Sequence, residues 1–592
     1  MLQNCNELLR GSKVIENGDL ILNYLDRLGI EYVFGVPGGS IEPLYNALAR
    51  SERKGGPKAI LARHEAGAAF MADGYARATG KIGVCCSTSG PGATNLITGV
   101  ASAYADSIPL LVITAQPAID KFGLGAFQEG SCTGINTVTM FESCTRYNTL
   151  VSHSAQLENK LLQAISYTKS NCPGPAHLSI PLDIMRAKVE PKYGIQQLRA
   201  FINHEVVTNE IGLELLLTHL SDAQKVTFVV GEGCSGAVNQ LLELVELRGW
   251  LMVTTPMAKG FVSDFHPLYR GVFGLGGHES AREALLPQNA DYVVVIGTAL
   301  DEVTTGGWDT EAILSNRMIH LSPNSEHLSR SVLSKACILG SPKLLLEQLF
   351  ERMNKPEERV EIEYLPDVDG FPMYVEYRDK GVCFKNTSPV KPQALYWTLS
   401  QLCPQDTYVL MDTGNSFLWG IHYWQTHNRP GVEENLFHIG MGFASMGWAI
   451  GASIGMALGG KSPVICFTGD GSVLMSGQEM TVAKEHNLNI LFVILNDSHL
   501  GMIKHGQLLG GAEDIGNELP QVDFAAMARA MGLEGHRINS LSELDTIGID
   551  EIFRQAGPCV LDVLIDANEV PPMGSRMKVL AGGGGATDGE KM

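Results

Sequence analysis

Two aspartates in the last third of the chain, Asp470 and Asp497, have the residue type and the spacing to bind one divalent cation. The apolar run 463–467 predicts a buried strand, residues 472–487 predict a helix, and residues 489–495 predict a second strand. The two strands of such a unit are parallel, so both carboxylates are expected at the same edge of one sheet. Carboxylate oxygens are hard ligands, and the arrangement predicts a site for magnesium or calcium.

Glycines on both sides of Asp470 add a second feature, which is room for a phosphate group. Gly469 and Gly471 carry no side chain, so a ligand can approach the backbone closely. The amide groups that open the predicted helix at Ser472 can donate hydrogen bonds to an anion. The motif therefore predicts a metal and diphosphate site. The simpler interpretation is a tight strand-to-helix turn, with Asp497 in a surface loop.

Composition restricts the class of protein that must position these residues. The chain has 592 residues, of which 45% are apolar and 18% charged, which is typical of a globular protein of several domains. No apolar run reaches membrane-spanning length, and a formal charge of -20 opposes nucleic-acid binding. The twelve cysteines include no CxxC pair, and the polar start of the chain has no signal-peptide core. We therefore expect a cytoplasmic protein without a nucleic-acid or membrane partner.

Alternating strand and helix patterns predict an α/β fold with three doubly wound parallel-sheet domains. The domains are expected at residues 1–190, 207–353 and 390–568, with a proline-containing linker at 354–389 and a polar tail at 569–592. The clearest predicted strands of the first two domains are 32–36, 84–87, 110–114, 227–230, 292–296 and 317–321.

The middle domain also contains a glycine motif, Gly231 to Gly236, directly after a predicted strand. Its spacing is that of a dinucleotide-binding turn, but the stretch 248–251 lacks the acidic residue that would bind the ribose. A tight turn without a nucleotide explains the motif equally well, so flavin binding is doubtful.

Three further motifs in the first domain indicate a family. The chain reads RHEAGA at 63–68, MADGYAR at 71–77 and TSGPGATN at 88–95. Together with the glycines at 35–39 and the GDGS motif at 469–472, these segments make most of the chain resemble the thiamine-diphosphate enzymes. The acetolactate synthase group is the most similar. The resemblance implies a pyrimidine-binding, a middle and a diphosphate-binding domain in this order.

The resemblance assigns the catalytic step to Glu65. This glutamate matches the one that hydrogen-bonds the cofactor pyrimidine and so acts as the base that starts the cycle, whereas by residue type alone it could be a helix-capping carboxylate. Met446 matches the apolar residue that bends the cofactor, although a core methionine is the alternative. Ala444 and Met446 are also expected to contact the pyrimidine through their backbones.

At the other end of the cofactor, the resemblance makes Asp470 and Asp497 the side-chain ligands of magnesium. His499 is expected to contribute its backbone carbonyl. The family often has asparagine where this chain has Asp497, and because aspartate is also an oxygen ligand we expect magnesium binding to survive. The residues expected at the phosphates are Gly414, Asn415, Ser416, Gly471 and Ser472. In this family Glu65 and Asp470 meet across a subunit interface, which implies a homodimer or a homotetramer.

Substrate choice is expected at four further positions. Phe127 and Gln128 match the synthase pocket beside the reactive carbon, and Arg146 replaces a family lysine. Arg146 could bind a 2-oxo acid carboxylate or could make a structural ion pair. Gly506 stands where synthases have a tryptophan, which predicts a roomier acceptor pocket. The stretch Ala299 to Val303 lacks both arginines of a family RFDDR run, so an obligatory flavin is not expected.

These observations predict a thiamine-diphosphate and magnesium dependent carboligase. It would decarboxylate a 2-oxo acid, plausibly pyruvate, and join the resulting enamine to a second carbonyl compound, as in branched-chain amino acid biosynthesis. An alternative is a 2-oxo acid decarboxylase or aldehyde lyase of the same family, although the chain lacks the His-His pair of many decarboxylases. A remoter alternative is a catalytically silent scaffold.

Overall fold

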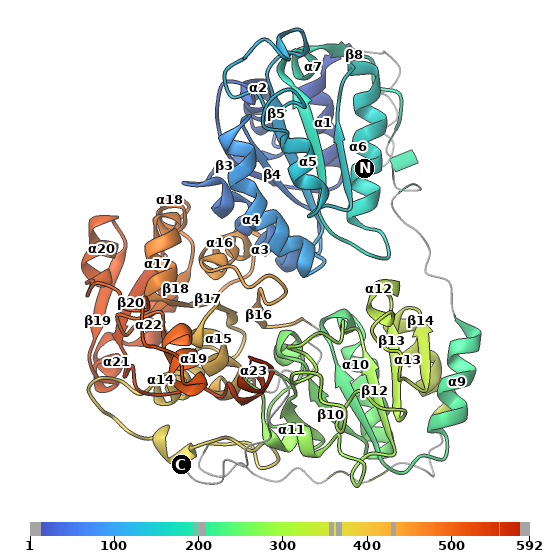
Figure 1. Cartoon of the computed structure of the whole chain (residues 1–592), viewed down its shortest axis with the longest axis vertical. Coiled ribbons are helices and arrows are strands. Elements are labelled where there is room, and N and C mark those ends of the chain that lie inside the picture. The colour runs from blue at the N-terminus through green and yellow to red at the C-terminus, as the bar shows by residue number, and fades with distance from the viewer. Residues whose placement is uncertain are drawn as a thin grey trace. The chain divides into compact units, whose positions relative to one another are not determined.

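The computed structural model describes residues 14–194, 197–198, 201, 209–354, 360, 362, 370–427, 434–555 and 557–580 of the chain. Within this part, the strands form three six-stranded sheets and one two-stranded sheet (Figure 1). Neighbouring strands of the six-stranded sheets pair in parallel wherever their register is known. The predicted α/β class with three parallel sheets is confirmed. None of the described helices is both long and apolar enough to cross a bilayer.

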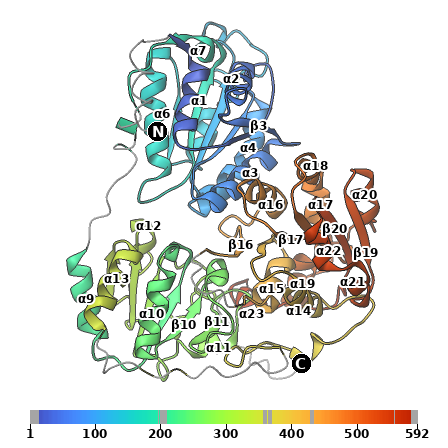
Figure 2. The same ribbon diagram turned by 180° about the vertical axis from the view of Figure 1, so that it is seen from behind.

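The chain divides into two compact units, each of which is described by itself. The first unit combines Met1–Glu205 with two segments from the last third of the chain, Gly442–Val464 and Met475–Ile490. The second unit comprises Val206–Met441, Ile465–Leu474 and Leu491–Met592. Figure 2 shows the elements of both units from behind.

The sheet of the first unit has the order β3-β2-β4-β5-β7-β6. Its strands are β2 (Tyr32–Val36), β3 (Lys58–Leu61), β4 (Gly83–Ser87), β5 (Leu110–Gln116), β6 (Tyr147–Leu150) and β7 (Ala176–Pro181). The helices between them are α1 (Asn17–Arg27), α2 (Glu42–Glu52), α3 (Glu65–Thr79), α4 (Pro91–Ala105), α5 (Thr137–Glu142), α6 (Ser154–Thr168) and α7 (Leu182–Arg186). A two-stranded sheet of β1 (Ile15–Glu16) and β8 (Lys188–Val189) lies beside them.

Helix α3 packs unusually closely against a helix from the last third of the chain, α16 (Trp448–Leu458). A Cβ atom added at Gly74 would lie 1.9 Å from the carbonyl oxygen of Ala452, and one at Gly455 would lie 1.8 Å from that of Met71. Only glycine fits at either position, because any side chain would force the two helix backbones apart. The close crossing fixes the start of α3, which begins at Glu65.

The middle domain contributes the sheet β11-β10-β9-β12-β13-β14. Its strands are β9 (Val226–Val230), β10 (Leu251–Thr254), β11 (Tyr269–Val272), β12 (Tyr292–Ile296), β13 (Met318–Ser322) and β14 (Ala336–Leu339). Its helices are α9 (Glu210–Leu220), α10 (Val238–Arg248), α11 (Glu279–Glu283), α12 (Ser325–Leu328) and α13 (Pro342–Met353). Strand β9 is buried along its whole length, as expected for a sheet covered on both faces.

The third sheet has the order β16-β15-β17-β18-β20-β19. Its strands are β15 (Tyr408–Met411), β16 (Phe437–Ile439), β17 (Val464–Gly469), β18 (Ile490–Asn496), β19 (Glu534–Ile538) and β20 (Cys559–Leu564). Helices of this part of the second unit are α14 (Pro392–Leu402), α15 (Asn415–Tyr423), α19 (Gly501–Gly510), α20 (Phe524–Ala530), α21 (Ser542–Ile547), α22 (Ile549–Arg554) and α23 (Gly574–Leu580).

The helix predicted over residues 472–487 is wrong as a single helix. The structure divides this segment into α17 (Asp470–Ser476), a 3-10 turn (Gly477–Glu479) and α18 (Met480–Glu485). Gly477 interrupts the apolar pattern, and the turn that follows it buries the side chain of Glu479.

Within the segment predicted as a linker, several of the described residues from 370 onwards are buried. Phe371 and Tyr377 are buried in an apolar core that they share with the last sheet. The glycine-rich end of the predicted tail, residues 581–592, lies outside the described residues.

Candidate functional site

Asp470 and Asp497 follow β17 and β18, which are neighbouring parallel strands of the last sheet. Asp470 accepts hydrogen bonds from the amides of Gly471 at 2.8 Å and Ser498 at 2.7 Å. Asp497 accepts one from the amide of His499 at 3.0 Å. The Ser498 amide thus ties the loop after β18 to the carboxylate after β17. Ser498 has a φ of 57°, which is rare for a serine and indicates a constrained loop.

The two carboxylates repel each other. Burial, reinforced by the negative charge of Asp497, raises the pKa of Asp470 to about 7. Burial also raises the pKa of Asp497. A divalent cation between them would reverse this electrostatic effect, because it stabilises both groups in their charged form. The donor set of this edge therefore fits magnesium.

Polar atoms without partners lie beside the two aspartates. Within the described part of the chain, Ser472 Oγ and Asn415 Oδ1 are buried and accept or donate no hydrogen bond. Gly414 has a φ of 127°, and a Cβ atom added at Gly414 or Gly469 would meet nothing within 4 Å. Buried polar groups normally have partners. Open backbone beside unpartnered polar atoms is what a diphosphate would need.

Two of the predicted phosphate-binding groups already have partners. The hydroxyl of Ser416 donates to the carbonyl oxygen of Asp412 at 2.6 Å. The amide of Gly471 donates to Asp470, as described above. These two groups shape the strand-to-helix turns, whereas Asn415 Oδ1 and Ser472 Oγ have no partner among the described residues.

Gly506 lies on α19, where a Cβ atom would meet nothing within 4 Å. The same helix places the buried His505 against Asn415, whose amide donates to His505 Nδ1 at 3.0 Å. In the sequence, His505 has no distinctive pattern and is notable only as the neighbour of Gly506.

Glu65 belongs to the first unit, where it is the first residue of α3 and only 9% exposed. The side-chain amide of Asn95, on α4, donates to Glu65 Oε2 at 3.0 Å. A Cβ atom at Gly92 would lie 3.3 Å from Glu65 Oε1. The capping role at this helix start belongs to His64, which accepts a hydrogen bond from the amide of Ala66 at 3.1 Å. Glu65 is therefore held in place but not used as the helix cap.

Met446 lines a cavity of about 270 Å³ within the first unit. Asn95, the partner of Glu65, lines the same cavity, as does Glu479. Ala444, two residues before Met446, has a φ of 55°. This left-handed backbone is strained for alanine and is the kind of feature that collects at ligand sites.

The predicted substrate residues lie at different edges of the first sheet. Gln128 lies close to Gly90, at the end of β4, because a Cβ atom there would be 3.0 Å from Gln128 Cβ. Phe127, beside it, is 86% exposed. Arg146 precedes β6 and so lies at the opposite edge of this parallel sheet. Its guanidinium lies 4.4 Å from the centre of the Tyr104 ring and donates to the Tyr104 hydroxyl at 3.3 Å.

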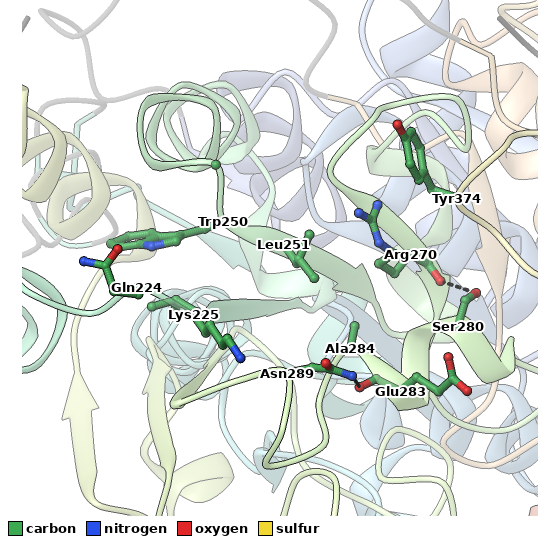
Figure 3. A pocket seen from close by; sticks show the side chains of 12 residues that line it. Gln224, Lys225, Trp250, Leu251, Arg270, Ser280, Glu283, Ala284, Asn289 and Tyr374 are labelled. Atoms are coloured by element: carbon green, nitrogen blue, oxygen red, sulfur yellow. Dashed lines mark hydrogen bonds between the residues drawn. The ribbon is translucent and has the colours of Figure 1, made fainter. Parts of the chain in front are cut away.

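A larger cavity, of about 440 Å³, opens in the middle domain at the amino ends of β9 and β10 (Figure 3). Lys225 and Arg270 lie on its walls, and none of the predicted site residues does. Ligands of open α/β sheets bind at the opposite, carboxyl edge. The size of this cavity is therefore no evidence that it is the functional site.

At the carboxyl edge of the middle sheet, other protein atoms occupy the space beside the glycine motif that follows β9. A Cβ atom at Gly231 would lie 2.5 Å from the carbonyl oxygen of Gly297, and one at Gly233 would lie 2.9 Å from Gly297 Cα. These glycines let two loops pack together. The tight-turn interpretation accounts for the motif without a dinucleotide.

Models of three protein domains match the chain in order. They are the thiamine pyrophosphate enzyme N-terminal TPP binding domain at residues 15–135, the central domain at 213–349 and the C-terminal TPP binding domain at 412–563. The acetolactate synthase isozyme 2 large subunit of Escherichia coli is 32% identical, over 95% of this chain and 98% of its own length. An acetolactate synthase of Arthrospira platensis is 30% identical over 93% and 94%.

A solved structure has the same fold. It is an X-ray structure of a candidate thiamin diphosphate-dependent enzyme from Mycobacterium smegmatis, with a TM-score of 0.76 and 21% sequence identity. The match covers 93% of this chain and 99% of that one. At this identity the similarity concerns the fold alone.

Proposed function

The chain belongs to the thiamine pyrophosphate enzyme family, with acetolactate synthase large subunits among its relatives, and from this premise we propose that it is a carboligase that joins a 2-oxo acid to a second carbonyl compound. The proposed donor is pyruvate, and the nearest named reaction is acetolactate formation. A role in branched-chain amino acid biosynthesis follows if the acceptor is also a 2-oxo acid. The observation that carries the proposal is the retention of a held Glu65 together with the Asp470 and Asp497 pair.

We propose that Asp470 and Asp497 bind magnesium through their side chains and that His499 adds its backbone carbonyl. The mutual repulsion of the two carboxylates supports a cation there. We assign the diphosphate to the turns around Gly414 and Gly471, where Asn415 Oδ1 and Ser472 Oγ have no other partner among the described residues. The backbone of Gly414 leaves open space for the phosphate oxygens.

Thiamine diphosphate, when bound, supplies a thiazolium carbon acid whose conjugate base adds to a carbonyl group. Glu65 holds the proton that the pyrimidine ring exchanges, and Asn95 orients its carboxylate. Met446 would provide apolar support for the cofactor from the wall of the cavity that it lines. We assign the backbone of Ala444, whose φ of 55° is strained, to contacts with the pyrimidine.

Substrate selection is assigned to Phe127 and Gln128 beside the reacting carbon, and to Gly506 at the acceptor. The open space at Gly506 supports an acceptor pocket wider than one narrowed by tryptophan. We assign Arg146 to the carboxylate of a 2-oxo acid, and its contact with Tyr104 makes a structural role the alternative. The packed glycine turn of the middle domain supports a reaction that needs no flavin.

We further propose that the enzyme is a cytoplasmic homodimer or homotetramer in which Glu65 of one subunit serves the metal site of another. Exposed apolar side chains of the first unit, Phe127, Phe443 and Met475, are 86%, 54% and 57% exposed and are suited to an interface. None of the eleven described cysteines forms a disulfide, which fits a reducing compartment.

The proposal is tested by incubating the purified chain with thiamine diphosphate, magnesium, pyruvate and a panel of acceptors, followed by mass spectrometry. The expected result is a ligation product, with bulky aldehydes accepted beside 2-oxo acids. Release of acetaldehyde alone would identify a decarboxylase, and cofactor binding without turnover would identify a silent scaffold. The Glu65→Gln variant should lose turnover while binding magnesium as well as the unaltered chain.

A further inference from the structure

Glu479 is a buried carboxyl group of the first unit that the proposed reaction does not use. It ends the 3-10 turn Gly477–Glu479 and is 1% exposed. Its Oε2 accepts a hydrogen bond from the backbone amide of Arg63 at 3.1 Å. Its Oε1 is buried and has no hydrogen-bond partner among the described residues. A buried carboxyl oxygen without a partner is unusual in a protein interior.

Helix α3 is shaped to receive this side chain. A Cβ atom added at Gly67 would lie 2.4 Å from Glu479 Cδ, so any residue larger than glycine would displace the carboxyl group. Gly67 is two residues beyond Glu65 on the first turn of α3. The carboxyl group of Glu479 therefore packs against the turn that carries Glu65.

Glu479 also lines a cavity that reaches the hydrogen-bond partner of Glu65. Glu479, Met446 and Asn95 all line the cavity of about 270 Å³, and Asn95 is the residue that donates to Glu65. The cavity thus joins a second acid to the hydrogen bond that orients Glu65. This places Glu479 where its charge and that of Glu65 act on each other.

Electrostatics support a proton on Glu479 near neutral pH. Burial, with a smaller contribution from the charge of Glu65, raises the pKa of Glu479 to about 7. The amides of Arg63 and His64 and the guanidinium of Arg63 act in the opposite direction. Helix α16, which packs on the same turn, carries no charged residue. Lys484 and Glu485 are the charged residues of α18, which follows it.

We propose that Glu479 is a positioning residue whose change of charge sets the pH range in which Glu65 works. When Glu479 is neutral, it adds no negative charge beside the turn that carries Glu65. When Glu479 is ionised, the two like charges oppose each other. The proposal rests on the proposed function, because it assigns Glu479 to the same proton-transfer centre as Glu65.

The first test compares Glu479→Gln with Glu485→Gln. Both remove a carboxylate that contacts Arg63, but Glu485 is exposed and pairs with the Arg63 guanidinium at 2.7 Å. In Glu479→Gln the midpoint of the pH–kcat profile is expected to shift to lower pH by roughly one unit, with KM changed less than about twofold. The Glu485→Gln profile is expected to coincide with that of the unaltered chain. If both profiles coincide with it, the proposal is overturned.

The second test needs no catalytic activity, so it separates this proposal from the proposed function. Infrared difference spectra between pH 6 and pH 8, taken with magnesium bound, should contain a protonated carboxyl band that Glu479→Gln lacks and Glu485→Gln keeps. The pH values are set on either side of the pKa of about 7. A band unchanged in Glu479→Gln overturns the proposal, whether or not the chain ligates substrates.

A measurement on the unaltered chain decides the case in which Glu479→Gln fails to fold. In protein grown with isotope-labelled glutamate, the titrating carboxyl band should shift in frequency, because a glutamic acid and not Asp470 carries the proton. A band that keeps its frequency overturns the proposal.

Discussion

The side-chain amide of Asn415 donates a hydrogen bond to Nδ1 of His505 at 3.0 Å, and His505 Nε2 in turn donates to the carbonyl oxygen of Ala567 at 3.1 Å. Because a carbonyl oxygen only accepts, Nε2 carries the proton and Nδ1 is the acceptor. Burial lowers the pKa of His505, which keeps the ring in this neutral form. The ring therefore fixes the amide of Asn415 with its Oδ1 unpaired, at the start of α15.

The first prediction concerns this pair. His505→Ala should weaken thiamine diphosphate binding by roughly fivefold, because losing one hydrogen bond to a positioned amide changes the free energy by about 1 kcal/mol. Titration of the apoprotein with the cofactor in excess magnesium, followed by tryptophan fluorescence, measures the change in Kd. His536→Ala is the control, since His536 pairs with Glu534 at 2.7 Å within β19. Equal affinities in all three proteins would contradict a role for His505.

The second prediction concerns the aspartate that replaces a family asparagine. Asp497→Asn keeps an oxygen ligand and removes one of two repelling charges, so magnesium-dependent activity should stay within about tenfold of the unaltered chain. Asp497→Ala removes the ligand and should abolish it. Activity measured over a magnesium titration tests both variants. Loss of activity in Asp497→Asn would mean that the second charge is required.

The third prediction concerns the acceptor pocket. Gly506→Trp introduces a large ring at a position where the structure leaves open space, so the chain should fold normally. Turnover with bulky aldehyde acceptors should fall by at least about tenfold relative to turnover with a 2-oxo acid, because a steric clash of a few kcal/mol acts on the larger acceptor alone. Gly506→Ala is the control for the loss of glycine itself. An unchanged ratio of acceptors would place the pocket elsewhere.

Much of the fold was predictable because the buried strands of a parallel sheet appear in the sequence as apolar runs. The predicted strands 32–36 and 292–296 coincide with β2 and β12. The helix over 472–487 could not be predicted correctly, because its interruption at Gly477 depends on burial of Glu479 against Gly67. That contact joins residues more than four hundred positions apart, and no local pattern reports it.

The candidate site was predictable to a different degree at each end. Asp470 and Asp497 follow from strand order alone, since parallel strands bring both to one edge. His505 and Glu479 have no distinctive local pattern. Their partners, Asn415 and the amide of Arg63, come from distant segments, so only the folded chain identifies them.

The last prediction concerns the pH dependence of stability. Glu479 has an ordinary pKa of 4.5, which the folded chain raises to about 7. The folded state therefore binds more protons than the unfolded state between these values, so the stability contributed by this group is fully present below pH 4.5 and is lost as pH rises through 7. The shift corresponds to about 3 kcal/mol at most.

Glutamine does not ionise, so the Tm of Glu479→Gln relative to the unaltered chain should rise between pH 5 and pH 8. Calorimetry at both pH values measures this difference. Glu485→Gln, which removes an exposed ion pair, should differ from the unaltered chain by a small and similar amount at each pH. A relative Tm of Glu479→Gln that stays constant or falls over this range would mean that the carboxyl group is already ionised at pH 5, and Glu479 would then be an ordinary structural acceptor for the Arg63 amide.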